Sequence, residues 1–126
     1  MPNPRKTGSE AEDRAASYLQ DKGFTIVTRR YKALRGEIDL IALDGETLVF
    51  VEVKFSRSRT RPAEEAIVDR KRSRLCLAAA QYLRTFEGPE RQVRYDVIAI
   101  GPGGLKHTPE AFWPEGEFGD DGITGS

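Results

Sequence analysis

The sequence contains too little cysteine and histidine for several common kinds of functional site. It has one cysteine, Cys76, and one histidine, His107, which excludes a disulfide framework and any zinc site built from cysteines or from a histidine cluster. No apolar run approaches the length of a membrane-spanning helix, and the first residues lack the apolar stretch of a signal peptide. We therefore expect a soluble, cytoplasmic protein with no membrane partner.

Other absences exclude further classes of enzyme. No glycine-rich phosphate loop follows a predicted strand, because the Gly-Pro-Gly-Gly stretch at 101–104 is not followed by Lys-Ser or Lys-Thr. No Ser-His-Asp or Cys-His set can be placed around His107, and Cys76 lies between two leucines of a predicted helix, which favours packing over nucleophilic chemistry. A pair of carboxylates could serve a glycosidase, but the chain is short and lacks the usual aromatic platform.

The formal net charge is zero, yet the charges are unevenly distributed. The span 54–74 holds eight Lys or Arg residues against three acidic ones, whereas the chain from Glu110 onward has five acidic residues and no Lys or Arg. A chain of 126 residues is long enough for one domain with a single core. We assign residues 1–112 to that domain and predict that the glycine-rich, acidic segment 113–126 is a disordered tail.

Three ionisable residues interrupt the two most apolar stretches of the chain. Residues 36–43 and 47–54 are rich in Ile, Leu, Val and Phe and flank an Asp-Gly turn signal, which predicts a β-hairpin. Asp39 lies in the first strand, and Glu52 and Lys54 lie near the end of the second. Charged side chains in buried strands are costly unless they are paired or bind a metal. This cluster therefore indicates chemistry.

The length of the hairpin loop decides whether these three side chains share a face. A two-residue loop at 44–45 pairs position 39 with 50, and a four-residue loop at 44–47 pairs it with 52. Because side chains alternate along a strand, either even loop places Asp39 on the face of Glu52 and Lys54. A three-residue loop would place Asp39 on the opposite face and remove the basis for a shared site.

Residue periodicity predicts two helices and two further strands, at 9–22, 69–86, 24–30 and 92–100 respectively. We expect residues 1–8 to form a loose arm, and the pattern leaves open whether residues 63–68 belong to the second helix. The element order is then helix, three strands, helix, strand. An antiparallel meander followed by a helical crossover to a parallel strand gives an α/β fold, with a mixed sheet flanked by helices on both faces.

Two charged residues on the predicted helices are open to two interpretations. Glu12 lies on the inward stripe of the first helix, but with Ser9 it also forms a capping box; taken alone, this pattern favours the cap. A second box formed by Thr7 and Glu10 would free Glu12 from that role. Lys71 heads the apolar stripe of the second helix, where snorkelling of its side chain is the simpler explanation.

The hairpin residues resemble the active-site pattern of a nuclease superfamily. Asp39, twelve intervening residues and then Glu52-Val53-Lys54 are similar to the motif of the PD-(D/E)XK superfamily, and Glu12 matches the acidic residue of its first helix. The resemblance implies the restriction-endonuclease-like αβββαβ core of that superfamily. More narrowly, stretches between about residues 8 and 112 resemble the bacterial YraN-like family: 36–42 (GEIDLIA), 48–54 (LVFVEVK), 70–75 (RKRSRL), 82–83 (YL) and 95–97 (YDV).

Members of the YraN-like family are described as endonucleases similar to archaeal Holliday-junction resolvases, so the resemblance implies action on branched or otherwise structured DNA. This chain departs from the family pattern at several positions. Arg30 stands where Asn is frequent, and Val68-Asp69 replaces the Thr-Pro that normally opens the second helix. None of these departures removes an expected catalytic group.

Hydrolysis of a phosphodiester bond would give the charged cluster a consistent role. Mg²⁺, or Mn²⁺ in its place, takes oxygen ligands and keeps several waters, so two or three carboxylates suffice. Asp39 and Glu52 are the expected direct ligands, with the backbone carbonyl of Val53 as a third candidate. Lys54 would position or deprotonate the attacking water, or stabilise the pentavalent phosphate. Glu12 would bind a second metal ion or a water of the first.

The basic part of the chain supplies candidates for binding DNA. Lys71 would neutralise charge at the scissile phosphate. Six arginines would contact the flanking phosphates: Arg57, Arg59, Arg61, Arg70, Arg72 and Arg74. Phosphate contacts carry no sequence information, which suits recognition of DNA structure. Cutting two strands would take two such sites, so a homodimer is a candidate assembly.

Three functions remain open at this point. The first is a metal-dependent endonuclease acting on structured DNA. The second is a nucleic-acid-binding module that has the nuclease fold, cleaves nothing and acts with a partner protein; the near-neutral net charge keeps this alternative open. The third is a structural domain in which the carboxylates and Lys54 form a buried ion-pair network. The presence of all four residues of the pattern, Glu12 included, favours the first function.

Overall fold

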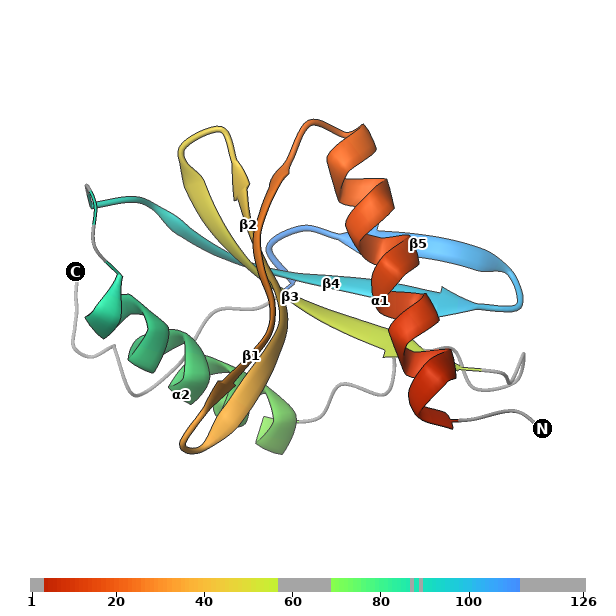
Figure 1. The fold of residues 1–126 in the computed structure, drawn as a ribbon, viewed down its shortest axis with the longest axis horizontal. Coiled ribbons are helices and arrows are strands. Elements are labelled where there is room, and N and C mark those ends of the chain that lie inside the picture. Colours follow the sequence, from red (N-terminus) through yellow and green to blue (C-terminus); the bar gives the residue numbers. More distant parts are fainter. Residues whose placement is uncertain (1–3, 57–68, 87, 89, 112–126) are drawn as a thin grey trace.

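The computed structural model describes residues 4–56, 69–86, 88 and 90–111, and it describes 4–9 and 69–73 by their backbone alone. Within these residues the chain forms two helices and a five-stranded mixed sheet (Figure 1). In chain order the elements are α1 (Pro4–Asp21), β1 (Thr25–Ala33), β2 (Gly36–Asp44), β3 (Thr47–Phe55), α2 (Asp69–Thr85), β4 (Val93–Gly101) and β5 (Gly104–Thr108).

The strands lie in the sheet in the order in which they occur in the chain, from β1 to β5. β3 and β4 run parallel, and the other neighbouring strands run antiparallel. The parallel pair follows the crossover through α2, because a strand needs a long connection to return in the same direction. The predicted α/β fold with a mixed sheet is therefore confirmed.

Three features differ from the predicted elements. α1 begins at Pro4, so the part of the expected loose arm from residue 4 onward is helical; a proline fits the first turn, where its missing N–H has no helical partner. β1 continues past Arg30 to Ala33. The pattern also does not predict β5, which pairs with β4 after a turn that ends at Gly104, where φ is 117°. The observed order is thus α-βββ-α-ββ, with one strand more than expected.

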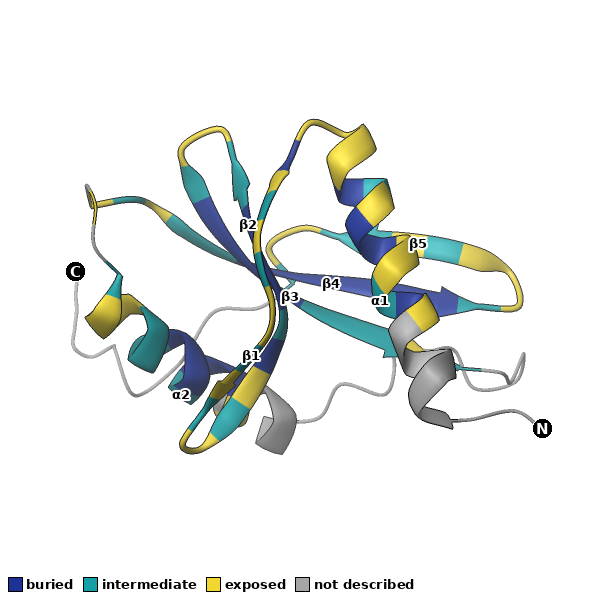
Figure 2. Ribbon diagram, in the orientation of Figure 1, coloured by how far each residue is buried: buried dark blue, intermediate teal, exposed yellow. Residues whose placement is uncertain are grey.

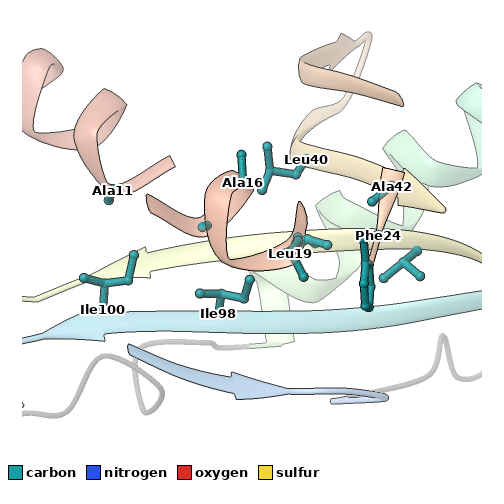
Figure 3. Packing of buried hydrophobic residues seen from close by; sticks show 11 residues of the cluster. Ala11, Ala16, Leu19, Phe24, Leu40, Ala42, Ile98 and Ile100 are labelled. Atoms are coloured by element: carbon teal, nitrogen blue, oxygen red, sulfur yellow. The ribbon is translucent and has the colours of Figure 1, made fainter. Parts of the chain in front are cut away.

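The two helices cover opposite faces of the sheet, and buried residues line both sides of the central strands (Figures 1 and 2). On the first face, small α1 residues such as Ala16 let the helix approach the sheet, and Leu19 lies near Ile98 of β4 (Figure 3). On the other face, α2 packs on a second cluster: Ile38, Ile41, Leu48, Phe50, Leu75, Cys76, Ala78, Ala79, Tyr95 and Val97. The predicted packing role of Cys76 is confirmed.

The β2–β3 hairpin has an even loop, as the shared site requires. Asp44 pairs with Thr47, so the loop consists of Gly45 and Glu46, and pairing continues to Leu40 and Val51. This loop is one residue later than the expected two-residue loop, so the pairing of position 39 with 50 is wrong. The register is the one predicted for the four-residue alternative, in which position 39 lies opposite position 52. Gly45 has φ of 62°, a conformation that glycine adopts without steric cost.

Neither helix of the described part of the chain is long and apolar enough to cross a membrane.

Candidate functional site

A pocket of about 370 Å³ lies between the β1–β2 hairpin, β3 and the first turns of α2. Three acidic residues and two basic residues line it, together with three residues that are apolar or lack a side chain. They are Glu37, Asp39 and Glu52; Lys32 and Arg74; and Ala33, Gly36 and Leu75. The pocket thus contains two of the expected metal ligands and one of the expected phosphate-binding arginines.

Asp39 lies where the backbone pairing of β2 with β3 has ended. Its Oδ2 atom accepts a hydrogen bond of 2.8 Å from the backbone N–H of Val53, two residues beyond the last recorded pair at Val51. Burial and the negative charge of Glu52 raise the pKa of Asp39 to about 7, although the bond from Val53 opposes this shift. The pair is therefore electrostatically strained when both carboxylates are ionised.

Glu52 and Lys54 lie two residues apart on β3, so their side chains leave the strand on the same face. The Lys54 Nζ atom is 3.3 Å from Glu52 Oε2, and the two side chains are only 12% and 13% exposed. Lys54 thus places a positive charge beside one of the two expected metal ligands. Glu52 thus lies beside Lys54 and lines the same pocket as Asp39.

Glu12 does not cap α1. Because the helix begins at Pro4, Ser9 and Thr7 both lie inside it, and neither capping box marks its start. The Glu12 side chain is 13% exposed, and its Oε1 atom is 2.7 Å from Nε of Arg30 on β1. The interpretation of Glu12 as a capping residue is therefore wrong. Its charge still acts on Asp39, because Glu12 contributes to the raised pKa of that residue.

The structure brings together only part of the predicted metal site. Within the described ranges, no three Asp, Glu, His or Cys side chains form a group that could hold a metal ion. The site of two carboxylates is formed by Asp39 and Glu52, and Glu12 faces Arg30 instead of joining them as a third ligand. A cation at this pocket would therefore need further ligands, such as waters or a backbone carbonyl.

Several predicted DNA-binding residues lie outside what the structure describes. Arg57, Arg59 and Arg61 fall between β3 and α2, and the tail at 113–126 is also outside the described residues. The side chains of Arg70, Lys71 and Arg72 are not described, although their backbone belongs to α2. Among the six arginines, Arg74 is the one whose side chain is described, and it lines the pocket.

Sequence reasoning missed Arg30, Lys32 and Glu37, which lie in or beside the pocket. Lys32 pairs with Glu37 across the β1–β2 hairpin. The sequence did not predict how far β1 extends; the strand continues to Ala33 and so brings these residues next to the carboxylates.

Gly36 allows the β1–β2 hairpin to pack closely against α2. A Cβ atom at this position would lie 2.5 Å from the Arg74 carbonyl oxygen, so only glycine fits there.

A second carboxylate, Asp96 on β4, is buried in a different way. Its side chain is 0% exposed and accepts two hydrogen bonds from Arg94, at 2.9 and 3.0 Å. The His107 Nε2 atom lies 2.8 Å away, and the backbone N–H of Glu110 donates at 3.1 Å. Burial raises the pKa of Asp96, but the hydrogen bonds from His107, Arg94 and Glu110 together lower it below its usual value.

The chain resembles bacterial proteins over most of its length. Residues 11–100 match the family described as "Uncharacterised protein family UPF0102". A UPF0102 protein from Chlorobium limicola is 38% identical over 125 residues, which cover 90% of this chain and 96% of that protein. UPF0102 protein MCA0184 from Methylococcus capsulatus is 39% identical over 107 residues, or 85% of each chain, and a UPF0102 protein from Anaeromyxobacter dehalogenans is 40% identical over 120 residues, or 89% of this chain and 87% of the relative. This protein therefore belongs to the UPF0102 family.

Proposed function

We propose that this protein is a metal-dependent endonuclease that hydrolyses phosphodiester bonds in DNA, and that structured or branched DNA is its substrate. The observation that carries the proposal is the pairing of two strained carboxylates, Asp39 and Glu52, with Lys54 held at 3.3 Å from Glu52. The element order supports placing the fold with the PD-(D/E)XK nucleases, because it contains the αβββαβ succession of their core and adds β5.

The donor atoms at the pocket suit a hard divalent cation such as Mg²⁺ or Mn²⁺. Two carboxylates that repel each other are relieved by a cation between them, and burial together with that repulsion raises the pKa of Asp39. Mg²⁺ needs few protein ligands because it retains several waters. Asp39 and Glu52 would hold it, with the carbonyl of Val53 as a further ligand, since the N–H and C=O of one strand residue point to the same side and the N–H of Val53 points to Asp39.

A bound metal would polarise a phosphoryl oxygen and promote formation of hydroxide from water. The chain's own residues would do the remaining work. Lys54, held beside Glu52, would orient the attacking water or stabilise negative charge that develops on the phosphate. Lys32 and Arg74 lie in the same pocket and would hold the phosphates next to the scissile one.

The residues outside the described side chains keep the roles that the sequence assigns to them. Lys71 would neutralise charge at the scissile phosphate, and five arginines would hold flanking phosphates: Arg57, Arg59, Arg61, Arg70 and Arg72. Because these contacts go to phosphates, DNA affinity should fall steeply with salt and depend little on sequence. A homodimer would place two such sites on a branched substrate.

The test is cleavage of labelled DNA by the purified protein. Four-way-junction, flap, single-stranded and duplex DNA are incubated with Mg²⁺, with Mn²⁺ and with EDTA. We expect metal-dependent cleavage of the branched substrates by the wild type and none by Asp39→Asn or Lys54→Met. Glu46→Gln, which changes an exposed carboxylate in the turn of the same hairpin, is the matched control and should cleave as the wild type does.

Measurements of DNA binding distinguish an endonuclease from a non-catalytic nucleic-acid-binding module. Asp39→Asn should bind the junction in EDTA about as well as the wild type, because phosphate contacts need no metal. A wild-type protein that binds junctions but cuts no substrate with either metal would be a non-catalytic nucleic-acid-binding module. Cleavage by Asp39→Asn at the wild-type rate would remove the carboxylate pair from the mechanism.

A further inference from the structure

We infer that the pocket lined by Asp39 and Glu52 binds one divalent cation. Arg30 is a second positively charged residue of the site, in addition to Lys54, and it binds Glu12 so that Glu12 does not join Asp39 and Glu52 as a ligand. The inference rests on the proposed function, and it assigns to Glu12 a role different from that of a metal ligand. It concerns Arg30, a residue that the sequence pattern does not single out as part of the site.

The backbone position of Arg30 is the first observation. In the β1–β2 ladder Arg29 pairs with Leu40 and Tyr31 with Ile38, which leaves Arg30 opposite Asp39. Because position 39 also lies opposite position 52 in the next hairpin, the three residues Arg30, Asp39 and Glu52 form a row across β1, β2 and β3. The chain therefore carries a cation and two carboxylates at adjacent places of one sheet.

Arg30 holds this place at an energetic cost. Its φ is 56°, in the left-handed region that residues with a Cβ atom rarely adopt, and here it occurs inside a strand. Such a conformation persists where the surrounding structure compensates for it, and it is frequent at functional sites. The ion pair with Glu12 is one of the contacts that hold the Arg30 side chain.

The Arg30–Glu12 contact is the second observation. The Arg30 Nε atom lies 2.7 Å from Glu12 Oε1, a distance typical of a charge-assisted hydrogen bond. Glu12 is mostly buried, with 13% of its side chain exposed, whereas the Arg30 side chain is 46% exposed. The hydrogen bond and the charge of Glu12 raise the pKa of Arg30, and the charges of Asp39 and Glu37 add to this effect. Arg30 is thus the counter-ion of the buried Glu12 and is still close enough to act on Asp39.

The charge balance then favours a single metal ion. Glu12, Asp39 and Glu52 carry three negative charges when ionised, and Arg30 and Lys54 carry two positive charges. The other charged residues of the pocket, Glu37, Lys32 and Arg74, add one negative and two positive charges. One divalent cation turns the net charge of this partly buried group from about zero to about +2. A second divalent cation would add two more positive charges and would compete with Arg30 for Glu12, which is costly in a poorly solvated site.

The experiment counts Mn²⁺ ions bound per chain and measures their affinity, by calorimetry and by electron paramagnetic resonance of free Mn²⁺, without DNA. The wild type should bind one Mn²⁺. Glu12→Gln should change the affinity less than about threefold, because Arg30 already neutralises Glu12. Arg30→Asn should bind the first Mn²⁺ about tenfold more tightly or bind a second one, because Glu12 becomes available as a ligand; asparagine tolerates a positive φ, so β1 should keep its course.

Two further variants complete the cycle. The double variant Arg30→Asn with Glu12→Gln should return to one Mn²⁺ at about wild-type affinity, and Arg30→Lys, which retains the positive charge, should behave as the wild type. Thermal unfolding in EDTA checks that each variant is folded. If Arg30→Asn does not fold, the Glu12→Gln measurement alone still decides, because a metal ligand cannot be replaced without loss of affinity.

The outcomes separate this inference from the proposed function. Two bound Mn²⁺ ions in the wild type, or a loss of affinity of tenfold or more in Glu12→Gln, would overturn the inference and leave the nuclease proposal standing. No Mn²⁺ binding at all would overturn both. One ion that depends on Asp39 and not on Glu12, with tighter binding in Arg30→Asn, is the expected result.

Discussion

Two carboxylates on the same sheet, Asp39 and Asp96, are surrounded in opposite ways. Asp96 is completely buried, yet Arg94, His107 and the N–H of Glu110 satisfy both of its oxygens, and its pKa is lowered. Asp39 accepts a bond from the N–H of Val53, faces the like charge of Glu52, and has its pKa raised to about 7.

This difference in surroundings distinguishes a carboxylate that stabilises the fold from one that suits a functional site. A carboxylate surrounded by donors stabilises the fold in its ionised form. A carboxylate placed beside another carboxylate destabilises the fold, and this arrangement is useful only where a cation or a proton resolves the repulsion. His107 belongs to the first kind of site: its Nδ1 atom lies 3.2 Å from the Tyr18 hydroxyl and its Nε2 atom contacts Asp96, so the single histidine links α1 to the β4–β5 hairpin.

The largest expected effect is at Asp96. Asp96→Asn should lower the free energy of unfolding by roughly 3–5 kcal/mol, because it removes the buried negative charge that Arg94 and His107 face. Arg94, with 16% of its side chain exposed, would keep Asp44 as an ionic partner. Chemical denaturation with an unchanged slope would measure it. Asp13→Asn is the matched control, since Asp13 pairs with Arg29 on the surface with 62% of its side chain exposed, and it should cost at most about 1 kcal/mol. Equal effects of the two changes would contradict the comparison.

The opposite sign is expected at Asp39. In EDTA at pH 8, Asp39→Asn should raise the free energy of unfolding by an amount on the order of 1–2 kcal/mol, because it removes one of two repelling charges while retaining an acceptor for the Val53 N–H. Saturating Mg²⁺ should stabilise the wild type and not the variant. A variant that unfolds more easily than the wild type in EDTA would show that Asp39, like Asp96, stabilises the fold in its ionised form.

The pH dependence sharpens the contrast. The folded-state pKa of Asp39 is raised from 3.8 to about 7, so the folded state retains a proton that the unfolded chain has released. The contribution of Asp39 to stability is therefore fully present below about pH 4 and is lost as the pH rises through about 7. Asp96 has a lowered pKa, so its contribution is present above its usual value of 3.8 and is lost as the pH falls below it.

Denaturation in EDTA between pH 5 and 8 would test this pattern. The wild-type free energy of unfolding should decline over that range more than the value for Asp39→Asn, and Mg²⁺ should reduce the decline. The same slope in both proteins would mean that another group controls the pH dependence.

The smallest expected effect is at Lys54. Lys54→Met should lower the free energy of unfolding in EDTA by about 1 kcal/mol, because Glu52 loses the positive charge at 3.3 Å and repels Asp39 more strongly. Lys54→Met and Asp39→Asn should therefore change the free energy of unfolding in opposite directions. A purely structural ion-pair cluster would lose stability with both changes.

Much of the fold follows from local patterns. The hairpin strands and the helix over residues 69–85 follow from apolar periodicity and turn residues, because these signals act over a few residues. The loop length of the hairpin was left open by the sequence, and the structure decides it. The start of α1 and the presence of β5 do not follow from local patterns, since proline is compatible with both a loose arm and a first helical turn, and β5 is short and exists by pairing with β4.

The sequence by itself determined which residues could form the site: two carboxylates and a lysine interrupt apolar strands, and strand alternation with an even loop brings them together. The tertiary structure alone decided which of them are satisfied. The same local pattern, a carboxylate in an apolar strand, describes both Asp39 and Asp96, and it leaves Glu12 open to two roles. Their partners come from other elements, Arg30 across the α1–β1 connection and His107 from β5. Periodicity reports the face of a side chain, whereas its charge environment depends on groups that only folding brings within about 3 Å.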